Sequence, residues 1–467
     1  CYISFTFRWP VIHLGTWAAG GSVVGARETS KLHEYAYQLQ DSCPSVVLVT
    51  EISMDVVIEV VKQCPSVKMI VCVRSSEEPL PLDVIDYEET LMLEPLREIV
   101  QVSPDSECMI FYSSGTTGMP KGVIHTHRTF HTALEMMNIH WLHELYPVLL
   151  GGIPVDLREE SQVVAFPCYH TSGFFMLNLS MLTGTPIVLM KTFDGDVYLN
   201  AIEKFKPRQL GISPPIFAYL AKRKAPLFSV EMITCGTAPL TQEICNEFRA
   251  IHPNVKYIVQ AYGMTENIAT HLPLLLEEGI NASAGIIASG FEQKIVDPQT
   301  HKLCEQGQRG ELWVRGPTRA VGYLNNEKAT REFIDEEGWM HTGDIAYIDQ
   351  RGLLYIVDRM KEMIKVNYKN QSLQVGPAII EGVLLSHHKI QDVAVVGVTT
   401  DQSGGELIRA FVVKADETLT SAEVEGIVAE TLEEYLHITG GVFFIDAIPR
   451  APTGKILRRA LKEITTA

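Results

Sequence analysis

"SSGTTGMPKG", residues 113–122, is a loop made of the residue types that bind phosphate. It contains three glycines, four hydroxyl side chains and Lys121. Glycines let the backbone approach an anion, amides and hydroxyls donate to it, and lysine adds positive charge. The Walker A pattern does not fit, because it requires Ser or Thr directly after the lysine, where Gly122 stands. The loop therefore predicts a phosphate site of another kind, with an ordinary surface loop as the alternative.

The flanks of this loop predict a strand on each side of it. "CMIFY" (108–112) precedes the loop, and "GVIHTH" (122–127) has the pattern of an extended segment before a helix begins near Arg128. Further out, short apolar runs alternate with helical patterns, which indicates a large α/β domain with mostly parallel sheets. The expected buried strands are 45–50, 68–73, 162–167, 186–190 and 257–263, and the expected helices are 53–63, 195–206 and 241–252.

After about residue 310 the pattern changes. "GELWVRG" (310–316) and "GLLYIVD" (352–358) predict a small, more antiparallel β-rich subdomain. The charged stretch that follows leads into a compact α+β unit. There we expect a hairpin whose turn contains Gly404 and Gly405, and then a helix that Thr420 and Glu423 open as a capping box and that runs to about residue 436.

We expect the domain boundary near residues 359–361. The chain would then consist of a large domain, residues 1–359, and a small mobile α+β domain, residues 360–467.

Composition narrows the function. The chain has 467 residues, 46% of them apolar, which is enough for a large core. Its net charge of −17 argues against a nucleic-acid partner bound by bulk attraction. The nine cysteines form no CxxC pair, and His125, His127 and His131 have no further ligands at zinc spacing. We therefore expect reduced thiols and no zinc site.

Location follows from two further features of the sequence. No apolar run reaches the roughly 18 residues of a membrane-spanning helix. The C-terminal "ITTA" differs from the S-K-L peroxisomal signal, so a cytoplasmic location is the default expectation.

The longer string "YSSGTTGMPKGV" (112–123) resembles the phosphate-loop motif of adenylate-forming enzymes, which include acyl- and aryl-CoA ligases, luciferases and peptide-synthetase adenylation domains. The resemblance runs from about residue 14 to the end and is nearest to the 4-coumarate–CoA ligase, luciferase and acyl-CoA ligase branch. The further motifs, in the family's order, are "PCYHTSGF" (167–174), "CGTAPL" (235–240), "QAYGMTE" (260–266), "GELWVRGP" (310–317), "GWMHTGD" (338–344), "YIVDRMKEMIK" (355–365) and "PRAPTGKILRR" (449–459).

The resemblance implies a two-step reaction. A carboxylate joins the α-phosphate of ATP and releases pyrophosphate, and the acyl-adenylate then reacts with a thiol. A carboxylic acid with a pKa of about 4–5 is already ionised at neutral pH, so the first step needs alignment and charge neutralisation rather than a general base. The expected protein is an ATP-dependent ligase that joins a fatty or aromatic acid to coenzyme A and uses Mg²⁺.

The resemblance also implies roles for single residues. Thr265 would contact the α-phosphate, and Glu266 would bind Mg²⁺ as a hard oxygen ligand. Asp344 would accept hydrogen bonds from both ribose hydroxyls, with Arg359 assisting. The expected ATP site comprises Ser113, Ser114, Gly115, Thr116, Thr117, Gly118, Lys121, Ala261, Tyr262, Gly263, Asp344 and Arg359.

Two lysines of the small domain would serve the two steps. Lys455 would bridge the carboxylate and the α-phosphate, and the Lys365 region would serve thiol transfer after the small domain rotates about a hinge near Lys361. In isolation each such residue also fits a helix cap, a turn or a solvated charge. The expected acyl pocket comprises His170, Gly236, Thr237 and Ala238.

Three features depart from the family. The chain begins inside the large domain, so we expect an N-terminal truncation. Thr237 stands where the family has a small residue. "IKVNYKNQSLQV" (364–375) carries four extra residues and lacks a glycine, for which Asn370 could supply left-handed geometry. The missing N-terminal segment and the insert at 366–372 make an impaired pseudoenzyme that binds acyl or nucleotide ligands one alternative. The resemblance leaves two others, a luciferase-like oxygenase that shares the adenylation step and a carrier-protein-dependent adenylation domain.

Overall fold

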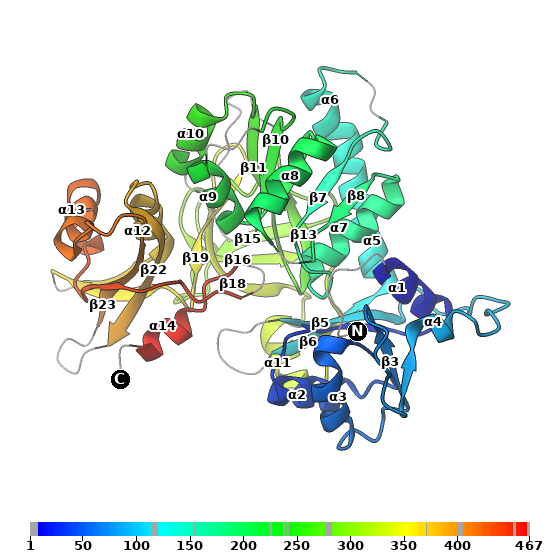
Figure 1. The fold of residues 1–467 in the computed structure, drawn as a ribbon. Coiled ribbons are helices and arrows are strands. Elements are labelled where there is room, and N and C mark those ends of the chain that lie inside the picture. Colours follow the sequence, from blue (N-terminus) through cyan, green and yellow to red (C-terminus); the bar gives the residue numbers. More distant parts are fainter. Residues whose placement is uncertain are drawn as a thin grey trace.

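The chain forms a large region of several packed sheets and a small C-terminal unit beside it (Figure 1). The segment after β19 connects the two, and α9 and α10 of the large region face α12 of the small unit. No helix among the described residues is both long and apolar enough to span a bilayer. The computed structural model describes residues 8–113, 120–153, 156–191, 193–223, 227–236, 240, 242–275, 283–369, 371–399, 405–451 and 454–464, without the side chains of Glu243, Gln371 and Ser372.

The N-terminal lobe contains the predicted strand–loop–strand unit. Strands β5 (Glu107–Ser113) and β6 (Lys121–Thr126) pair antiparallel, and α5 (His127–His140) follows directly. The sheet order is β1-β5-β6-β17, with β1 at Val23–Gly25 and β17 at Gly322–Tyr323. The neighbouring parallel sheet is β2 (Val46–Thr50), β3 (Met69–Val73) and β4 (Val84–Asp86), accompanied by α1 (Trp9–Ala18), α2 (Leu32–Ser42), α3 (Glu51–Val61) and α4 (Tyr87–Thr90).

The second lobe confirms the prediction of parallel strands. Strands β9 (Gln209–Ile212), β10 (Met232–Cys235) and β11 (Tyr257–Gln260) form one parallel sheet, and their apolar residues are buried between helices. The second parallel pair is β7 (Gln162–Val164) with β8 (Ile187–Leu189). The helices are the π-helix Trp141–Leu145, α6 (Tyr146–Leu149), α7 (Thr171–Thr183), α8 (Gly195–Phe205), α9 (Pro214–Arg223) and α10 (Gln242–Ile251).

The predicted β-rich subdomain is an antiparallel sheet between the second lobe and the small unit. Its order is β15 (Glu292–Val296), β16 (Gly310–Arg315), β18 (Met340–Ile348) and β19 (Leu354–Arg359), with α11 at Glu327–Phe333. A further antiparallel sheet contains β12 (Tyr262–Met264), β13 (Asn267–Leu272) and β14 (Ile286–Ile287).

One strand prediction in this part was wrong. The run 257–263 is not a single strand, because the chain leaves one sheet at Gln260 and enters another at Tyr262.

The small unit has its own apolar core and the predicted hairpin. Strands β22 (Ile390–Thr399) and β23 (Glu406–Lys414) pair antiparallel, and β24 (Val442–Phe444) joins β23 in parallel. Strands β20 (Ile364–Tyr368) and β21 (Gln371–Val375) form a second hairpin over the unusual segment. The left-handed residue there is Lys369, with φ 46°, whereas Asn370 lies outside the described residues. The helices are α12 (Pro377–Leu385), α13 (Ser421–Thr431), the 3₁₀ turn Glu434–Leu436 and α14 (Arg458–Ile464).

The helix after Thr420 begins as predicted but ends earlier. The Thr420 hydroxyl accepts from the backbone N–H of Glu423, at 3.2 Å. The helix stops at Thr431 rather than near residue 436, because Leu432 adopts an extended backbone conformation. Leu436 then reaches the core of the small unit from the 3₁₀ turn.

Candidate active site

Asp344 lies at the centre of a polar corner where β18 and β19 pair. Its side chain is 4% exposed, and Arg359 stands directly opposite on β19. Arg359 Nε lies 2.9 Å from Asp344 Oδ1, and the Tyr262 hydroxyl donates to Oδ2 at 2.5 Å. The nearby carboxylate raises the pKa of Arg359. Burial and the same carboxylate raise the pKa of Tyr262 well above its usual value, so its phenol remains a donor.

Gly263 explains why the backbone can run so close to this corner. A Cβ at Gly263 would lie 2.7 Å from the backbone nitrogen of Ala269 on the neighbouring strand. Only glycine permits that approach. Ala269 itself has a φ of 54°, an uncommon value for a residue with a side chain. The bend between β12 and β13 therefore depends on both residues, and it places Tyr262 against Asp344.

Lys455 reaches this corner from the small unit. Its ammonium lies 3.5 Å from Glu362 Oε1, and its side chain is 23% exposed. Burial lowers the pKa of Lys455; the positive charge of Arg359 lowers it further, and Glu362 and Asp344 raise it. Arg450 donates to the carbonyl of Gly454, the residue before Lys455, at 2.8 Å, and it pairs with Asp392 at 2.7 Å.

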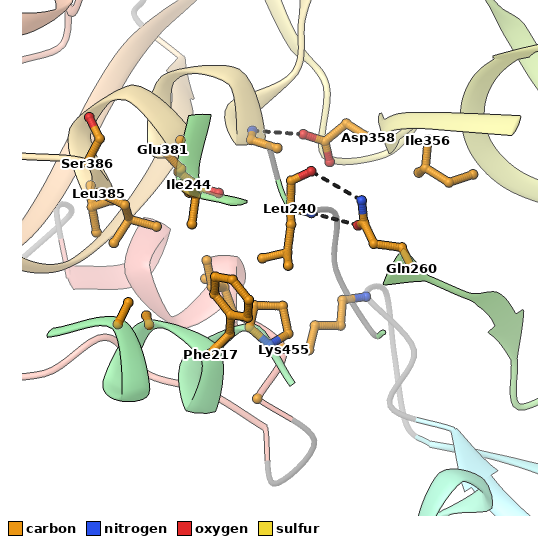
Figure 2. Close-up of a pocket in the computed structure, with 18 of the residues that line it drawn as sticks. Phe217, Leu240, Ile244, Gln260, Ile356, Asp358, Glu381, Leu385, Ser386 and Lys455 are labelled. Carbon is orange, nitrogen blue, oxygen red and sulfur yellow. Dashed lines mark hydrogen bonds between the residues drawn. The ribbon is translucent and has the colours of Figure 1, made fainter. Parts of the chain in front are cut away.

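A cavity of about 660 Å³ opens between the large region and the small unit at this point (Figure 2). Its wall includes Phe217 and Leu240 from one side and Leu385 from the other. The Gln260 side chain accepts from the Leu240 N–H at 2.7 Å and donates to the Leu240 carbonyl at 3.3 Å, which orders that wall. Tyr262, Asp344, Arg359 and Lys455 also line the cavity. The polar corner and the lysine therefore line one cavity at the junction.

The hairpin β5–β6 carries the base of the predicted phosphate loop. Ser113 and Lys121 are register partners, and the Ser113 hydroxyl donates to the Lys121 carbonyl at 3.4 Å. Ser114, Gly115, Thr116, Thr117 and Gly118 lie outside the described residues. The Lys121 ammonium lies 4.6 Å from the centre of the Tyr323 ring, whose hydroxyl donates to Glu266 Oε1 at 2.8 Å. The structure thus brings Lys121 and Glu266 to the same aromatic ring.

Glu266 satisfies a basic requirement for a magnesium ligand. Within the described residues its second carboxylate oxygen, Oε2, accepts no hydrogen bond. No group of three or more His, Cys, Asp or Glu side chains in that part of the chain could hold a metal ion. This arrangement fits Mg²⁺, which commonly binds through one or two carboxylates together with substrate phosphates.

Two family models match this chain. The model for the AMP-binding enzyme covers residues 2–324, and the model for the AMP-binding enzyme C-terminal domain covers residues 379–455. The chain belongs to the AMP-binding enzyme family. The residues that match the C-terminal model, 379–455, all belong to the small unit of this AMP-binding enzyme, which follows β19.

Curated relatives match nearly the whole chain. 4-coumarate--CoA ligase-like 9 of Arabidopsis thaliana is 34% identical over 97% of this chain and 78% of its own length. Acyl-CoA synthetase 7 of Caenorhabditis elegans is 34% identical over 96% of this chain and 82% of its own. Peroxisomal OPC-8:0-CoA ligase 1 of Arabidopsis thaliana is 33% identical over 98% of this chain and 82% of its own.

Solved structures share the fold. ATP-bound MatB from Rhodopseudomonas palustris has a TM-score of 0.84 at 22% identity and covers 99% of this chain and 87% of its own. The anthranilate CoA ligase AuaEII with anthranoyl-AMP has a TM-score of 0.85 at 22% identity and covers 99% of this chain and 86% of its own. Both confirm a large α/β domain followed by a small C-terminal domain.

Thr265 of this AMP-binding enzyme is fixed through its backbone. Its carbonyl accepts a hydrogen bond from Nε2 of the buried His125, at 2.7 Å. Burial lowers the pKa of His125 to about 4, so the imidazole is neutral at physiological pH. His125 therefore holds the turn between β12 and β13, which carries Thr265.

The predicted acyl-pocket residues are only partly described. His170 precedes α7 and lies against the Tyr169 ring, at 4.6 Å between ring centres. Burial lowers the pKa of His170 to about 4, and its Nε2 has no hydrogen-bond partner among the described residues. Gly236 directly follows β10, whereas Thr237 and Ala238 are not described. Among the described residues, the wall of the cavity includes neither His170 nor Gly236.

Lys365 lies apart from the cavity. It is exposed on β20, and its backbone N–H donates to Glu406 Oε2 at 2.9 Å. Lys361 is exposed in the turn after β19, where the Glu362 N–H donates to the Arg359 carbonyl at 2.9 Å. Of the two predicted lysines, the structure brings Lys455 alone to the Asp344 corner.

Sequence reasoning missed Tyr323 and Glu362. Glu362 contacts both Lys455 and Arg458, whose Nε lies 3.4 Å from Glu362 Oε2. Tyr323 belongs to a "GY" step shortly after the motif at 310–317. For Tyr323 the only available signal was an aromatic residue following a glycine, which by itself indicates no function. Glu362 lies within the motif at 355–365, but that motif assigned no role to it.

Proposed function

We propose that this chain is an ATP-dependent acid–thiol ligase that converts a hydrophobic carboxylic acid to its adenylate and then to its coenzyme A thioester. The observation that carries the proposal is the position of Lys455, which is partly buried at the domain junction beside Asp344 and Arg359. The named CoA ligases and acyl-CoA synthetases among its relatives support the same reaction.

The polar corner suits the ribose of ATP. Tyr262 and Arg359 hold the two oxygens of Asp344 in place, while each oxygen retains further acceptor capacity for a ribose hydroxyl. In this proposal Ala261 and Gly263 also contact the nucleotide, because they line the same cavity as Asp344. Arg359 keeps the carboxylate oriented.

Lys455 would bring the two anions together. Its ammonium lies in a partly desolvated space, where a positive charge stabilises a developing negative charge more strongly than in water. We assign it to the substrate carboxylate and the α-phosphate, which Thr265 also contacts. This lysine does not act as a base, because the carboxylate is already ionised.

The other phosphates belong to the hairpin end of the site. Ser113, Ser114, Gly115, Thr116, Thr117, Gly118 and Lys121 would bind the departing pyrophosphate in this proposal. Glu266 would hold Mg²⁺, which supplies positive charge to the phosphate oxygens when bound. In this proposal the protein orients the Glu266 carboxylate and the Lys121 ammonium on one side of the nucleotide.

The second step requires another arrangement of the small domain. We propose that residues 360–467 rotate about Lys361 relative to residues 1–359 and bring the Lys365 region to the adenylate. The acyl group would lie toward His170, Gly236, Thr237 and Ala238. A hydrophobic acid is proposed because His170 lies against the aromatic ring of Tyr169. The location in the cytoplasm remains a prediction.

The test is a step-resolved assay of the purified full chain. Pyrophosphate release from Mg·ATP is measured over a panel of fatty and aromatic acids, and thioester formation is then measured after coenzyme A is added. We expect both activities with at least one acid. Absence of pyrophosphate release with every acid would refute the proposal. Adenylation without thioester would favour the impaired enzyme, and light emission with luciferin and O₂ would favour the oxygenase.

A further inference from the structure

We propose that Tyr323 is a positioning residue that holds the carboxylate of Glu266 and the ammonium of Lys121 apart and ready for Mg·ATP. This inference rests on the proposed function, since it concerns the same phosphate end of the site. It assigns a role to a residue outside every motif that carried the resemblance.

The geometry places Tyr323 between two opposite charges. Its hydroxyl donates to Glu266 Oε1 at 2.8 Å, and the Lys121 ammonium lies 4.6 Å from the centre of its ring. A carboxylate and an ammonium near each other would otherwise tend to form an ion pair. With the ring in contact with the lysine and the hydroxyl in contact with the carboxylate, each charge is stabilised without neutralising the other.

The backbone fixes the tyrosine at this place. In strand β17, Tyr323 is the register partner of Val123 in β6, directly beside the phosphate hairpin. The Leu324 N–H donates to the Gly122 carbonyl at 2.7 Å, and the Tyr323 N–H donates to the Thr330 hydroxyl at 2.9 Å. Backbone hydrogen bonds therefore fix the position of Tyr323 relative to the hairpin that carries Lys121.

The same segment is also bonded to Glu266. The Ala320 N–H donates to the Glu266 carbonyl at 2.9 Å. Residues 320–324 therefore connect the backbone of the proposed magnesium ligand to the backbone of the phosphate hairpin. The tyrosine side chain makes the same connection between the functional groups.

The chemistry of the phenol suits this role. A phenol has an ordinary pKa of about 10, so it is a protonated donor at neutral pH. It can therefore donate to Oε1 and orient the carboxylate, while Oε2 faces no donor among the described residues. Hydrogen-bonded partners of metal-binding carboxylates commonly influence metal affinity in this way.

The decisive variant is Tyr323→Phe, which keeps the ring under Lys121 and removes only the hydroxyl. We expect the Mg²⁺ concentration for half-maximal pyrophosphate release to rise by about tenfold or more. The KM for the acid should stay unchanged, and the rate should recover largely at high Mg²⁺. Tyr323→Leu also removes the ring, so it should raise the KM for ATP in addition.

A binding measurement supplies a readout other than activity. Mn²⁺ binding in the presence of α,β-methylene-ATP is followed by electron paramagnetic resonance, and Tyr323→Phe should weaken it. Tyr355→Phe is the matched control. Tyr355 lies on β19, and its hydroxyl contacts Arg351 at 3.2 Å and Asp349 at 3.4 Å, away from Glu266. Circular dichroism and thermal melting check that each variant is folded.

A double-mutant comparison separates positioning from a general loss of structure. Glu266→Gln should weaken Mn²⁺ binding, and adding Tyr323→Phe to it should produce little further loss. An unchanged Mg²⁺ requirement and unchanged Mn²⁺ binding in folded Tyr323→Phe would overturn the inference. A third outcome separates the two proposals. If the wild type binds Mn²⁺ with the ATP analogue more tightly than Tyr323→Phe does, but releases no pyrophosphate with any acid, the proposed function is refuted and the inference is supported.

Discussion

Lys455 and Lys365 belong to the same small domain but have opposite surroundings. Lys455 lies in the cavity at the domain junction, 3.5 Å from Glu362, and burial lowers its pKa. Lys365 is exposed on a hairpin, where its backbone rather than its ammonium makes the contact with Glu406. This arrangement of the domains therefore presents one lysine to the Asp344 corner and leaves the other in solvent.

The difference shows how one small domain can serve two steps. A lysine that must neutralise phosphate needs a desolvated place, because its charge is screened in water. A second lysine on another face of the domain can reach the same place only if the domain turns. The three variants below test this comparison in order of expected effect.

The largest effect is expected from Lys455→Met. It should lower the rate of pyrophosphate release by about 10²–10³-fold, because it removes a cation directed at developing charge. Lys365→Met is the matched control and should leave this step unchanged while slowing thioester formation from added adenylate. Rapid-quench assays of the two steps measure both effects. Equal losses of adenylation in the two variants would contradict the comparison.

Glu362→Gln should have an intermediate effect. Glu362 raises the pKa of Lys455 against the lowering caused by burial. Without its charge the pKa falls further, so the lysine loses its proton at lower pH. The alkaline limb of the pH–rate profile for adenylation should move to lower pH, and misplacement of the ammonium should reduce the rate by roughly tenfold.

The control for this variant is Glu406→Gln. Glu406 also pairs with a lysine of the small domain, Lys462 at 3.5 Å, but it does not contact Lys455. The alkaline limb of the pH–rate profile of Glu406→Gln should coincide with that of the wild type. An unshifted profile in Glu362→Gln would show that Glu362 does not tune the lysine.

The smallest effect is expected from Lys222→Met. Lys222 lies on α9 of the large domain, and its ammonium donates to the carbonyls of Ile390 and Gln391 in the small domain, at 2.6 and 2.5 Å. Removing these bonds should destabilise this arrangement and lower adenylation by about threefold. Limited proteolysis should cleave the segment 359–363 faster.

Lys204→Met is the control for Lys222. Its ammonium contacts the ring of Phe205 on α8, within the large domain, at 5.1 Å. This variant should match the wild type in adenylation rate and in the rate of cleavage. A Lys222→Met protein that behaved in the same way would show that these bonds do not hold the domains together.

Local patterns were sufficient for much of the fold. The alternation of apolar runs predicted β2, β3, β7, β8 and β11, and the glycine-rich loop predicted the β5–β6 unit, because such patterns depend on neighbours in sequence. Two boundaries failed. The chain changes sheets at Ala261, and the helix after Thr420 ends at Thr431, since packing of Leu436 in the core overrides helix propensity.

The sequence by itself determined the fold class, the order of the motifs and the identity of the proposed site residues other than Tyr323 and Glu362. Only the tertiary structure decided which of them meet. Glu266 and Tyr323 are 57 positions apart, and Asp344 reaches Tyr262 across 82 positions. Glu362 reaches Lys455 only after the small domain has folded. The physical reason is that hydrogen bonds and charge interactions act over a few ångströms in space, whereas sequence patterns record only neighbours along the chain.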